Sequence, residues 1–334
     1  MPGYTAAMPS QQCANASLAD ISICTHGSAK TAKRAGDMLR YSNKHPLQNT
    51  QLTRIRVYIA PFFAECLGTT LFVLLGAGAN LTFTINTRTA QSAWMSNAFG
   101  CGFGLMLGVC VTGGISGSIL NPVVAVVFAL YRQLPWIRVP IYILAEFIGA
   151  FIGAILAYVC FAHSLDAFDG YNRQITSPYG TAGSFGSFPR PFISNGAAFL
   201  SQAVGAGMLI FGIFAITDPI NFPSRSTTPV AVGLLLTGIA ISLGYPAGFP
   251  YNAALDLGSR CAAAIWYGRE VFTFHQSYTW VPVVASFAGG ICAATAYQMF
   301  IVTERSLIVV VGSDNGNDFD SEERPEYTSS LSLH

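Results

Sequence analysis

Two asparagines, each at the start of a short apolar segment, are the residues of this sequence best suited to chemistry. Asn121 begins the apolar segment 121–131, and Asn252 begins the segment 252–264. Asparagine is a preferred N-cap, so each is expected to start a helix whose first N–H groups lack intrahelical partners. If both helices begin near the centre of a membrane, their positive dipole ends meet there and repel cations and protons. Each amide would also donate hydrogen bonds to a passing polar molecule.

The composition places these segments in a membrane. Of the 334 residues, 52% are hydrophobic and 10% are charged, whereas a soluble domain carries roughly 25% charged residues. A soluble surface needs more ionised side chains than this chain supplies. Seventeen Lys and Arg against sixteen Asp and Glu give a net charge of +1, which offers no basic surface to a nucleic acid.

Six apolar stretches are long enough, at about 20 residues, to cross a bilayer as helices. They are 57–79, 93–112, 136–160, 195–217, 229–245 and 278–302. The two segments that begin at Asn121 and Asn252 are too short to span, and they are expected to be re-entrant half-helices. The predicted fold class is therefore an all-α membrane protein with six transmembrane helices and two half-helices.

The two ends of the chain differ from this centre. Residues 1–50 and 312–334 are polar and lack apolar periodicity, and the second of these tails is acidic. Both are predicted to be disordered, on either side of a membrane domain over 51–311. Twelve Lys and Arg residues fall on the side of the membrane that holds the tails, and five fall on the other side. Positive charge is retained in the cytosol, so both termini are predicted to be cytosolic.

An internal repeat is visible in the order of the segments. Span, span, half-helix and span occur in 57–163 and again in 194–305. Similar residues fall at matching places: Glu65-Cys66-Leu67-Gly68 with Gln202-Ala203-Val204-Gly205, Leu120-Asn121-Pro122-Val123 with Tyr251-Asn252-Ala253-Ala254, and Ala145 and Gly149 with Ala285 and Gly289. Each half has three spans, an odd number, so the chain is on the opposite side of the membrane when the second copy begins. Inverted repeats of this kind place their site near the midplane, where discontinuous helices meet.

Three motifs resemble the major intrinsic protein family, the aquaporins and aquaglyceroporins, over roughly 57–305. They are Ala64-Glu65-Cys66-Leu67-Gly68-Thr69, the stretch 114–123, which is close to the family pattern GHISGxHxNPA, and the stretch 248–260, which is similar to the aquaglyceroporin form GFxxNPARDxGPR. The resemblance implies a passive channel for water and small uncharged solutes, a homotetramer with one pore per subunit, and no catalytic residue, metal or cofactor. The residues expected at the pore centre are Asn121, Pro122, Val123, Asn252, Ala253 and Ala254.

The resemblance also implies a selectivity filter, the narrowest part of family pores. Its four positions here are Cys101, Ala240, Phe249 and Leu255. Leu255 stands where the family has an arginine, a group that repels cations and hydrogen-bonds a permeating hydroxyl. A wide apolar filter would pass glycerol, urea or hydrogen peroxide besides water. An apolar constriction with few donors would instead lose its water and conduct poorly.

Ionisable groups inside the spans are costly and are usually paired or functional. Glu65 matches a family glutamate that accepts hydrogen bonds from the backbone before a half-helix, and in the second repeat Gln202 takes its place. Together with Asp256, which marks the aquaglyceroporin branch, these residues are expected to support the hairpins. Glu146 has no obvious partner and is expected to be protonated or to face the bundle interior.

Two other functions remain open from the sequence. A coupled secondary transporter also uses broken helices, with Glu146 as its candidate ion ligand. A non-conducting membrane protein with a regulatory or scaffold role would tolerate the altered motifs. An enzyme is not expected, because no nucleophile, metal cluster or catalytic histidine accompanies Glu65 and Glu146. Asn80 begins a glycosylation sequon in the predicted first extracellular loop, and the plasma membrane is the expected location.

Overall fold

The computed structural model describes residues 51–86, 90–221 and 225–306. The predictions made for the tails 1–50 and 312–334 lie outside these residues. The chain divides into two compact units, Met1–Tyr58 and Ile59–His334. The helices discussed below belong to the second unit, except for the first residues of α2, which begins at Gln51.

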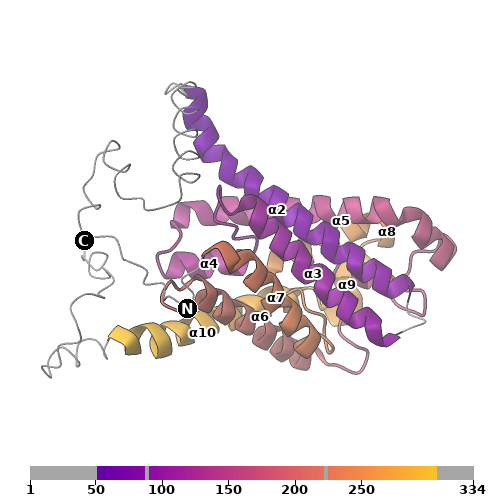
Figure 1. Cartoon of the computed structure of the whole chain (residues 1–334). Helices are drawn as coiled ribbons and strands as arrows, with labels where there is room; N and C mark the ends of the chain where they lie inside the picture. The colour runs from indigo at the N-terminus through magenta and orange to yellow at the C-terminus, as the bar shows by residue number, and fades with distance from the viewer. Residues whose placement is uncertain (1–50, 87–89, 222–224, 307–334) are drawn as a thin grey trace, which may run out of the picture. The chain divides into compact units, whose positions relative to one another are not determined.

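The described residues form helices and no strand, as the sequence predicts (Figure 1). Their α-helices are α2 (Gln51–Ile85), α3 (Ala90–Thr112), α4 (Pro122–Leu130), α5 (Val139–Asp169), α6 (Asn195–Thr217), α7 (Thr228–Leu243), α8 (Ala253–Tyr267), α9 (Glu270–Ser277) and α10 (Trp280–Tyr297). Five of the helices are long and apolar enough to cross a membrane. The remaining predicted span, α7, is an apolar helix of 16 residues, which is about 24 Å long.

Two helical segments differ from the sequence prediction: the end of α5 and the short helix α9 that follows α8. Helix α5 continues to Asp169, beyond the predicted end of its span at 160. The short helix α9 was not predicted, and its backbone leaves helical geometry at Phe274, His275 and Gln276. Both segments are more polar than the spans, so hydropathy alone gave no signal for them.

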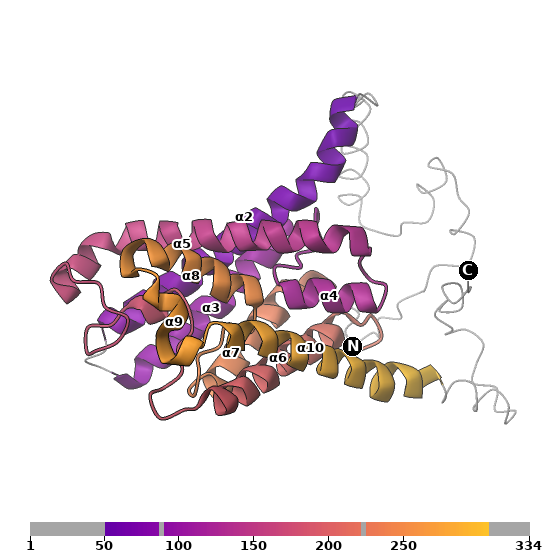
Figure 2. The same cartoon turned by 180° about the vertical axis from the view of Figure 1, so that it is seen from behind.

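The two half-helices α4 and α8 lie among the longer helices. They contact each other, and both contact α5 and α10. In Figures 1 and 2 they follow one another along the length of the bundle, each covering part of it. The long helices pack in pairs, α6 with α10 and α3 with α7, and α5 packs along α8. This arrangement brings the start of both half-helices into the interior.

Matched glycines show that the repeat predicted from the sequence is a structural one. Gly149 of α5 lies against the backbone carbonyl of Cys66 on α2, and Gly289 of α10 lies against the carbonyl of Ala203 on α6. A Cβ atom at either glycine would overlap that carbonyl. Small residues allow helix backbones to approach closely inside a membrane, and the same contact recurs at equivalent positions of the two halves.

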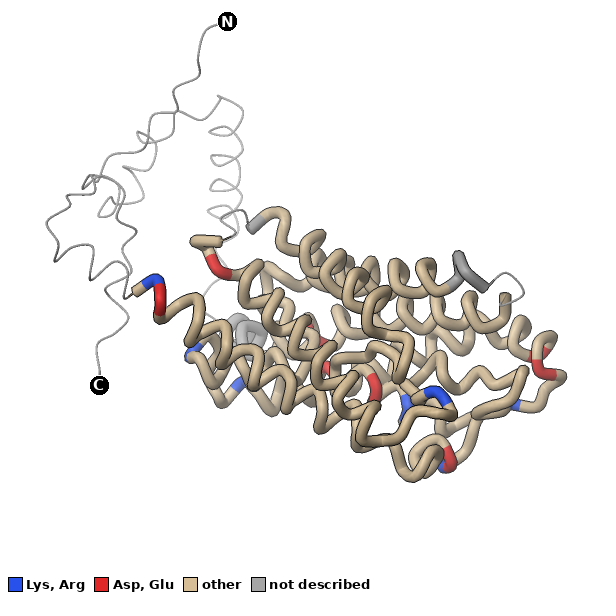
Figure 3. The backbone as a smooth tube through the Cα atoms, turned by 90° about the horizontal axis from the view of Figure 1, so that it is seen from below, with Lys and Arg blue, Asp and Glu red and all other residues tan. Residues whose placement is uncertain are grey.

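Charged residues are sparse along the helices. In Figure 3 most of the blue and red segments lie at loops and helix ends. Within the bundle, Glu65, Glu146, Asp256 and Arg260 are fully buried. These four are the charged side chains whose contacts define the site described next.

Candidate functional site

Both half-helices begin at the predicted asparagines. Asn121 caps α4 with an extended backbone, and its side-chain oxygen accepts a hydrogen bond from the N–H of Val123 at 3.0 Å. Asn252 caps α8 in the same way, accepting from Ala254 at 3.0 Å and from Leu255 at 3.1 Å. Pro122 and Ala253 are the first helical residues, and alanine is acceptable there because it retains helix propensity.

The amide nitrogens of the two caps bind across the centre of the molecule. Asn121 Nδ2 donates to the carbonyl of Tyr251 at 3.0 Å, and Asn252 Nδ2 donates to the carbonyl of Leu120 at 2.6 Å. Each amide thus ties one half-helix to the residue before the other. An amide nitrogen carries two hydrogens, so each asparagine has one more to offer to a molecule in the pore.

The residues before the caps hold an unusual backbone conformation. Leu120 has φ of 51° and Tyr251 has φ of 44°, which is the left-handed region that non-glycine residues seldom adopt. Their side chains pack against Gly68 and Gly205, where a Cβ atom would clash with them. The repeat therefore keeps a glycine opposite each strained residue, and the strain turns both carbonyls toward the opposite asparagine.

Two carboxyl groups hold the hairpin before α4. The N–H groups of Ile119 and Leu120 donate to the two oxygens of Glu65 at 3.0 and 2.7 Å. The next N–H, of Asn121, donates to Glu146 Oε1 at 3.0 Å. Three successive backbone donors are thereby satisfied. Glu146 faces the bundle interior, and it shares with Glu65 the work of supporting the hairpin.

The hairpin before α8 is supported with the opposite hydrogen-bond polarity. Gln202 Nε2 donates to the carbonyls of Ala247 and Gly248 at 2.8 and 3.2 Å. Pro250 has no N–H to donate, so the second hairpin offers one backbone donor fewer than the first. A side-chain amide that donates to carbonyls is therefore a suitable replacement for the carboxylate.

Asp256 lies on α8 and anchors a neighbouring loop. Its carboxylate pairs with Arg260 at 2.9 Å and accepts from the N–H and hydroxyl of Ser187 at 2.7 and 2.8 Å. Arg260 also donates to the carbonyls of Ser187 and Val271 at 2.6 and 2.9 Å, and its guanidinium lies 4.6 Å from the ring centre of Phe188. Arg260 is buried in this network and does not take the place of the filter arginine.

A cavity of about 440 Å³ opens beside the half-helix α8. Three of the four predicted filter residues, Cys101, Phe249 and Leu255, line it. Ala240 is fully buried, and α7 faces the cavity through Leu236 and Gly244. Ala240 itself does not line this cavity.

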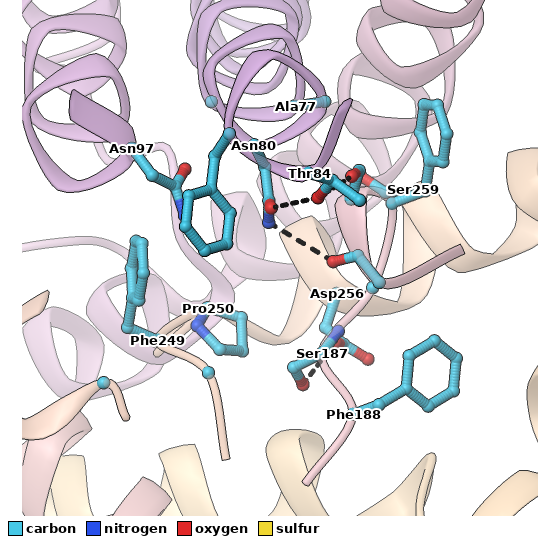
Figure 4. A pocket seen from close by; sticks show the side chains of 18 of the residues that line it. Ala77, Asn80, Thr84, Asn97, Ser187, Phe188, Phe249, Pro250, Asp256 and Ser259 are labelled. Atoms are coloured by element: carbon cyan, nitrogen blue, oxygen red, sulfur yellow. Dashed lines mark hydrogen bonds between the residues drawn. The ribbon is translucent and has the colours of Figure 1, made fainter. Parts of the chain in front are cut away.

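Asn80 does not lie in a loop, as the sequon suggested, because α2 continues to Ile85. Its side chain faces the cavity, and its Nδ2 donates to the carbonyl of Gly183 at 3.3 Å (Figure 4). A glycan would have to be attached to this nitrogen, inside the cavity.

Several further polar residues line the cavity and were not singled out from the sequence. Among them, Asn97 on α3 and Ser259 on α8 are buried and lie on the same helices as two of the predicted filter residues. A helical count from the filter would have found them, since Asn97 precedes Cys101 by four residues and Ser259 follows Leu255 by four. Within the described part of the chain, no group of three or more His, Cys, Asp or Glu side chains could hold a metal ion.

Comparison with known proteins agrees with this architecture. The sequence profile of the major intrinsic protein family matches residues 51–297. Aquaglyceroporin-2 of Rhizophagus irregularis is 43% identical over 241 residues, which cover 72% of this chain and 76% of that protein. Aquaporin-2 of Rhizopus delemar is 36% identical over 241 residues, with the same coverage of both chains.

A solved structure shows the same fold. The X-ray structure of the aquaglyceroporin from Plasmodium falciparum matches with a TM-score of 0.68 at 27% identity, covering 75% of this chain and 99% of that one. The chain therefore belongs to the major intrinsic protein family, whose members are membrane channels for water and small solutes and not enzymes.

Proposed function

We propose that this protein is a passive channel that passes glycerol and other small uncharged solutes besides water, through a filter that lacks the family arginine. The observation that carries the proposal is the lining of the cavity, where Leu255, Cys101 and Phe249 present apolar or weakly polar surfaces. A leucine at this position neither charges the pore nor binds a hydroxyl, and it leaves an apolar wall for the carbon atoms of a polyol.

Exclusion of protons and cations then falls to the pore centre. The N-termini of α4 and α8 meet there, each equivalent to about half a positive charge. The cross-bonds of Asn121 and Asn252 fix the remaining amide hydrogens in place. A water molecule that accepts from these amides is held in one orientation, which breaks a proton-conducting chain.

Several properties of the assembled channel follow from the same family resemblance. We propose a homotetramer with one pore per subunit, both termini in the cytosol and the plasma membrane as its location. In that orientation the cavity beside α8 opens to the extracellular side.

Stopped-flow measurements on proteoliposomes test the proposal. Purified full-length protein is reconstituted, and swelling or shrinking is followed in gradients of water, glycerol, urea and hydrogen peroxide. We expect faster water and glycerol flux than in protein-free vesicles. Rates equal to those of empty vesicles for every solute would instead support a poorly conducting or regulatory membrane protein, which the apolar filter also permits.

The assay also separates the channel from a coupled transporter. The candidate ion ligand of a transporter is Glu146, of which one oxygen accepts the N–H of Asn121 and the other has no partner among the described residues. For a passive channel we expect glycerol flux to be independent of proton and sodium gradients. Flux that follows either gradient would identify a transporter.

Leu255→Arg tests the assignment of the filter. An arginine here would bring a permanent charge and five donors into the cavity, narrowing it and binding hydroxyls. We expect the glycerol-to-water permeability ratio to fall by roughly tenfold, on the order of 1.4 kcal/mol, with water flux retained. An unchanged ratio would show that Leu255 does not line the narrowest part of the pore.

A further inference from the structure

Two buried polar side chains line the cavity one helical turn beyond the predicted filter. Asn97 precedes Cys101 by four residues on α3, and Ser259 follows Leu255 by four residues on α8. Four residues of helix span about 6 Å. Helix α3 leads toward the hairpin before α4, whereas α8 leads away from Asn252. Both residues are therefore displaced from the filter in the same direction, toward the loop residues 183–191 that complete the cavity wall.

The two side chains differ in how they are hydrogen-bonded. Asn97 is 1% exposed, and its Oδ1 accepts a weak bond from the Cys101 thiol at 3.8 Å. Ser259 is 3% exposed, and its Oγ is buried without a hydrogen-bond partner among the described residues. A buried donor or acceptor that stays unpaired is costly, so the Ser259 hydroxyl would gain from a polar group in the cavity.

The remaining cavity wall near the filter suits a solute that is polar on one side and apolar on the other. Figure 4 shows Asn97 and Asn80 directed into the cavity, with Phe249 and Pro250 on the facing loop. The Asn80 amide is already engaged with Gly183 and Thr84. Next to the predicted filter positions, Asn97 and Ser259 contribute polar groups, whereas Phe249 and Leu255 contribute carbon surface.

We infer that Asn97 and Ser259 form a hydrogen-bonding station for small polyhydroxy solutes, placed just outside the apolar filter. Asn97 Nδ2 donates to a solute hydroxyl, and the Ser259 hydroxyl donates or accepts. The station supplies polar contacts that the filter lost with its arginine, and it selects polyols over water because one polyol engages both groups. This inference rests on the proposed function, since it concerns solutes that the channel is proposed to pass.

The test compares water and glycerol permeability of full-length protein in proteoliposomes for the wild type, Asn97→Leu and Ser259→Ala. Leucine approximates the shape of asparagine without its amide. Each variant is expected to lower glycerol permeability about two- to tenfold, the effect of one neutral hydrogen bond, and to leave water permeability within about twofold. Retained water flux in the same vesicles shows that the variant is folded.

Ser184→Ala is the matched control. The Ser184 hydroxyl lines the same cavity and is buried, but it already lies 3.3 Å from Thr84 Oγ1. Its removal is expected to leave the glycerol-to-water ratio unchanged.

Three results would overturn the inference while the proposed function stands. The first is an unchanged glycerol-to-water permeability ratio in both Asn97→Leu and Ser259→Ala. The second is an equal loss of water and glycerol flux in both variants. The third is a fall of this ratio in Ser184→Ala as large as the fall in the other two variants. Wild-type vesicles without any protein-dependent flux would overturn the proposed function, and the inference with it.

Discussion

The two half-helices reach the same geometry by different chemistry. Four and eight residues after its asparagine, α4 carries Ala125 and Ala129, which are buried in the apolar core. At the same positions α8 carries Asp256 and Arg260, which form a buried ion pair. Both helices are capped identically, so the cap fixes where each begins. The residues that follow decide what each half-helix holds in place.

Helix α4 needs only to fill the core, whereas α8 must also fix a loop over the cavity. The Asp256–Arg260 pair binds both the N–H and the carbonyl of Ser187. The same contrast extends to the repeats: among the described residues of 57–163 no side-chain ion pair is formed, whereas 194–305 contains Asp256–Arg260 and Asp218–Arg305. Of the two repeats as bounded here, the second is therefore the one that contains side-chain ion pairs among the described residues.

The largest expected effect comes from breaking the ion pair of α8. Arg260→Leu leaves the Asp256 carboxylate buried without its partner and frees the carbonyls of Ser187 and Val271. Removing one partner of a buried pair costs about 3–5 kcal/mol. We expect a large fall in the unfolding temperature of the detergent-solubilised protein, measured by thermal denaturation.

A double variant sharpens this prediction. Asp256→Ala with Arg260→Ala gives α8 the residues found in α4 and removes both charges together. It is expected to be more stable than Arg260→Leu, because no unpaired charge stays buried. If the double variant is as unstable as the single one, the contacts to Ser187 and Val271, and not the charge, hold the loop.

The second prediction compares the two hairpins. Glu65→Ala removes the acceptors of two buried N–H groups, at about 1–3 kcal/mol each. Gln202→Ala removes a donor from the carbonyls of Ala247 and Gly248. The Ala247 carbonyl keeps the hydroxyl of Tyr278 as a donor, so we expect the substitution to destabilise the protein by about 1 kcal/mol. Thermal denaturation of the two variants under identical conditions measures the difference. Equal destabilisation would mean that the amide of the second repeat supports its hairpin as strongly as the carboxylate of the first.

Most of the fold could be predicted from the sequence, for a physical reason. Long apolar runs can satisfy their backbone in a membrane only as helices, so five spans, the apolar helix α7 and both half-helices were located, although α2 and α5 continue beyond their predicted ends to Ile85 and Asp169. Asn121 and Asn252 were identified because an N-cap has a strong residue preference. Helix α9 and the end of α5 were missed, because loop-side segments carry neither a long apolar run nor a cap signal.

The site could be predicted only in part. Cys101, Phe249 and Leu255, which fixed counts from the family pattern assign to the filter, line the cavity. Ala240, assigned by the same kind of count, is buried and does not line it. Asn97 and Ser259 lie one helical turn from Cys101 and Leu255 and could have been found by count, whereas the place of Asn80 on the cavity depends on the packing of α2, which the sequon did not indicate. The reversed hydrogen-bond polarity at Gln202 likewise required the coordinates of the second hairpin.

The smallest expected effect concerns the other ion pair of the second repeat, at the end of α6. Asp218 pairs with Arg305 and accepts from the hydroxyl of Tyr297 at 2.7 Å and the N–H of Ile220 at 2.9 Å. Burial raises the pKa of the Asp218 carboxyl, but these hydrogen bonds and the charge of Arg305 outweigh it, so the pKa lies below its ordinary value of 3.8. A pKa lowered by folding stabilises the protein above the unfolded pKa, and this contribution is lost as the pH falls through the folded value.

Asp218→Asn keeps the shape of the side chain and removes its charge. We expect the variant to be less stable than the wild type by about 1 kcal/mol at pH 7, since the pair is partly exposed. The difference should shrink as the pH falls below 3.8 and through the lower pKa of the folded protein, where the wild-type carboxyl also becomes neutral. Thermal denaturation of both proteins at pH 7 and near pH 3 measures this. A difference that stays constant across that range would show that Asp218 acts through its hydrogen bonds alone, and that α8 carries the one charge-dependent anchor among the described residues of the second repeat.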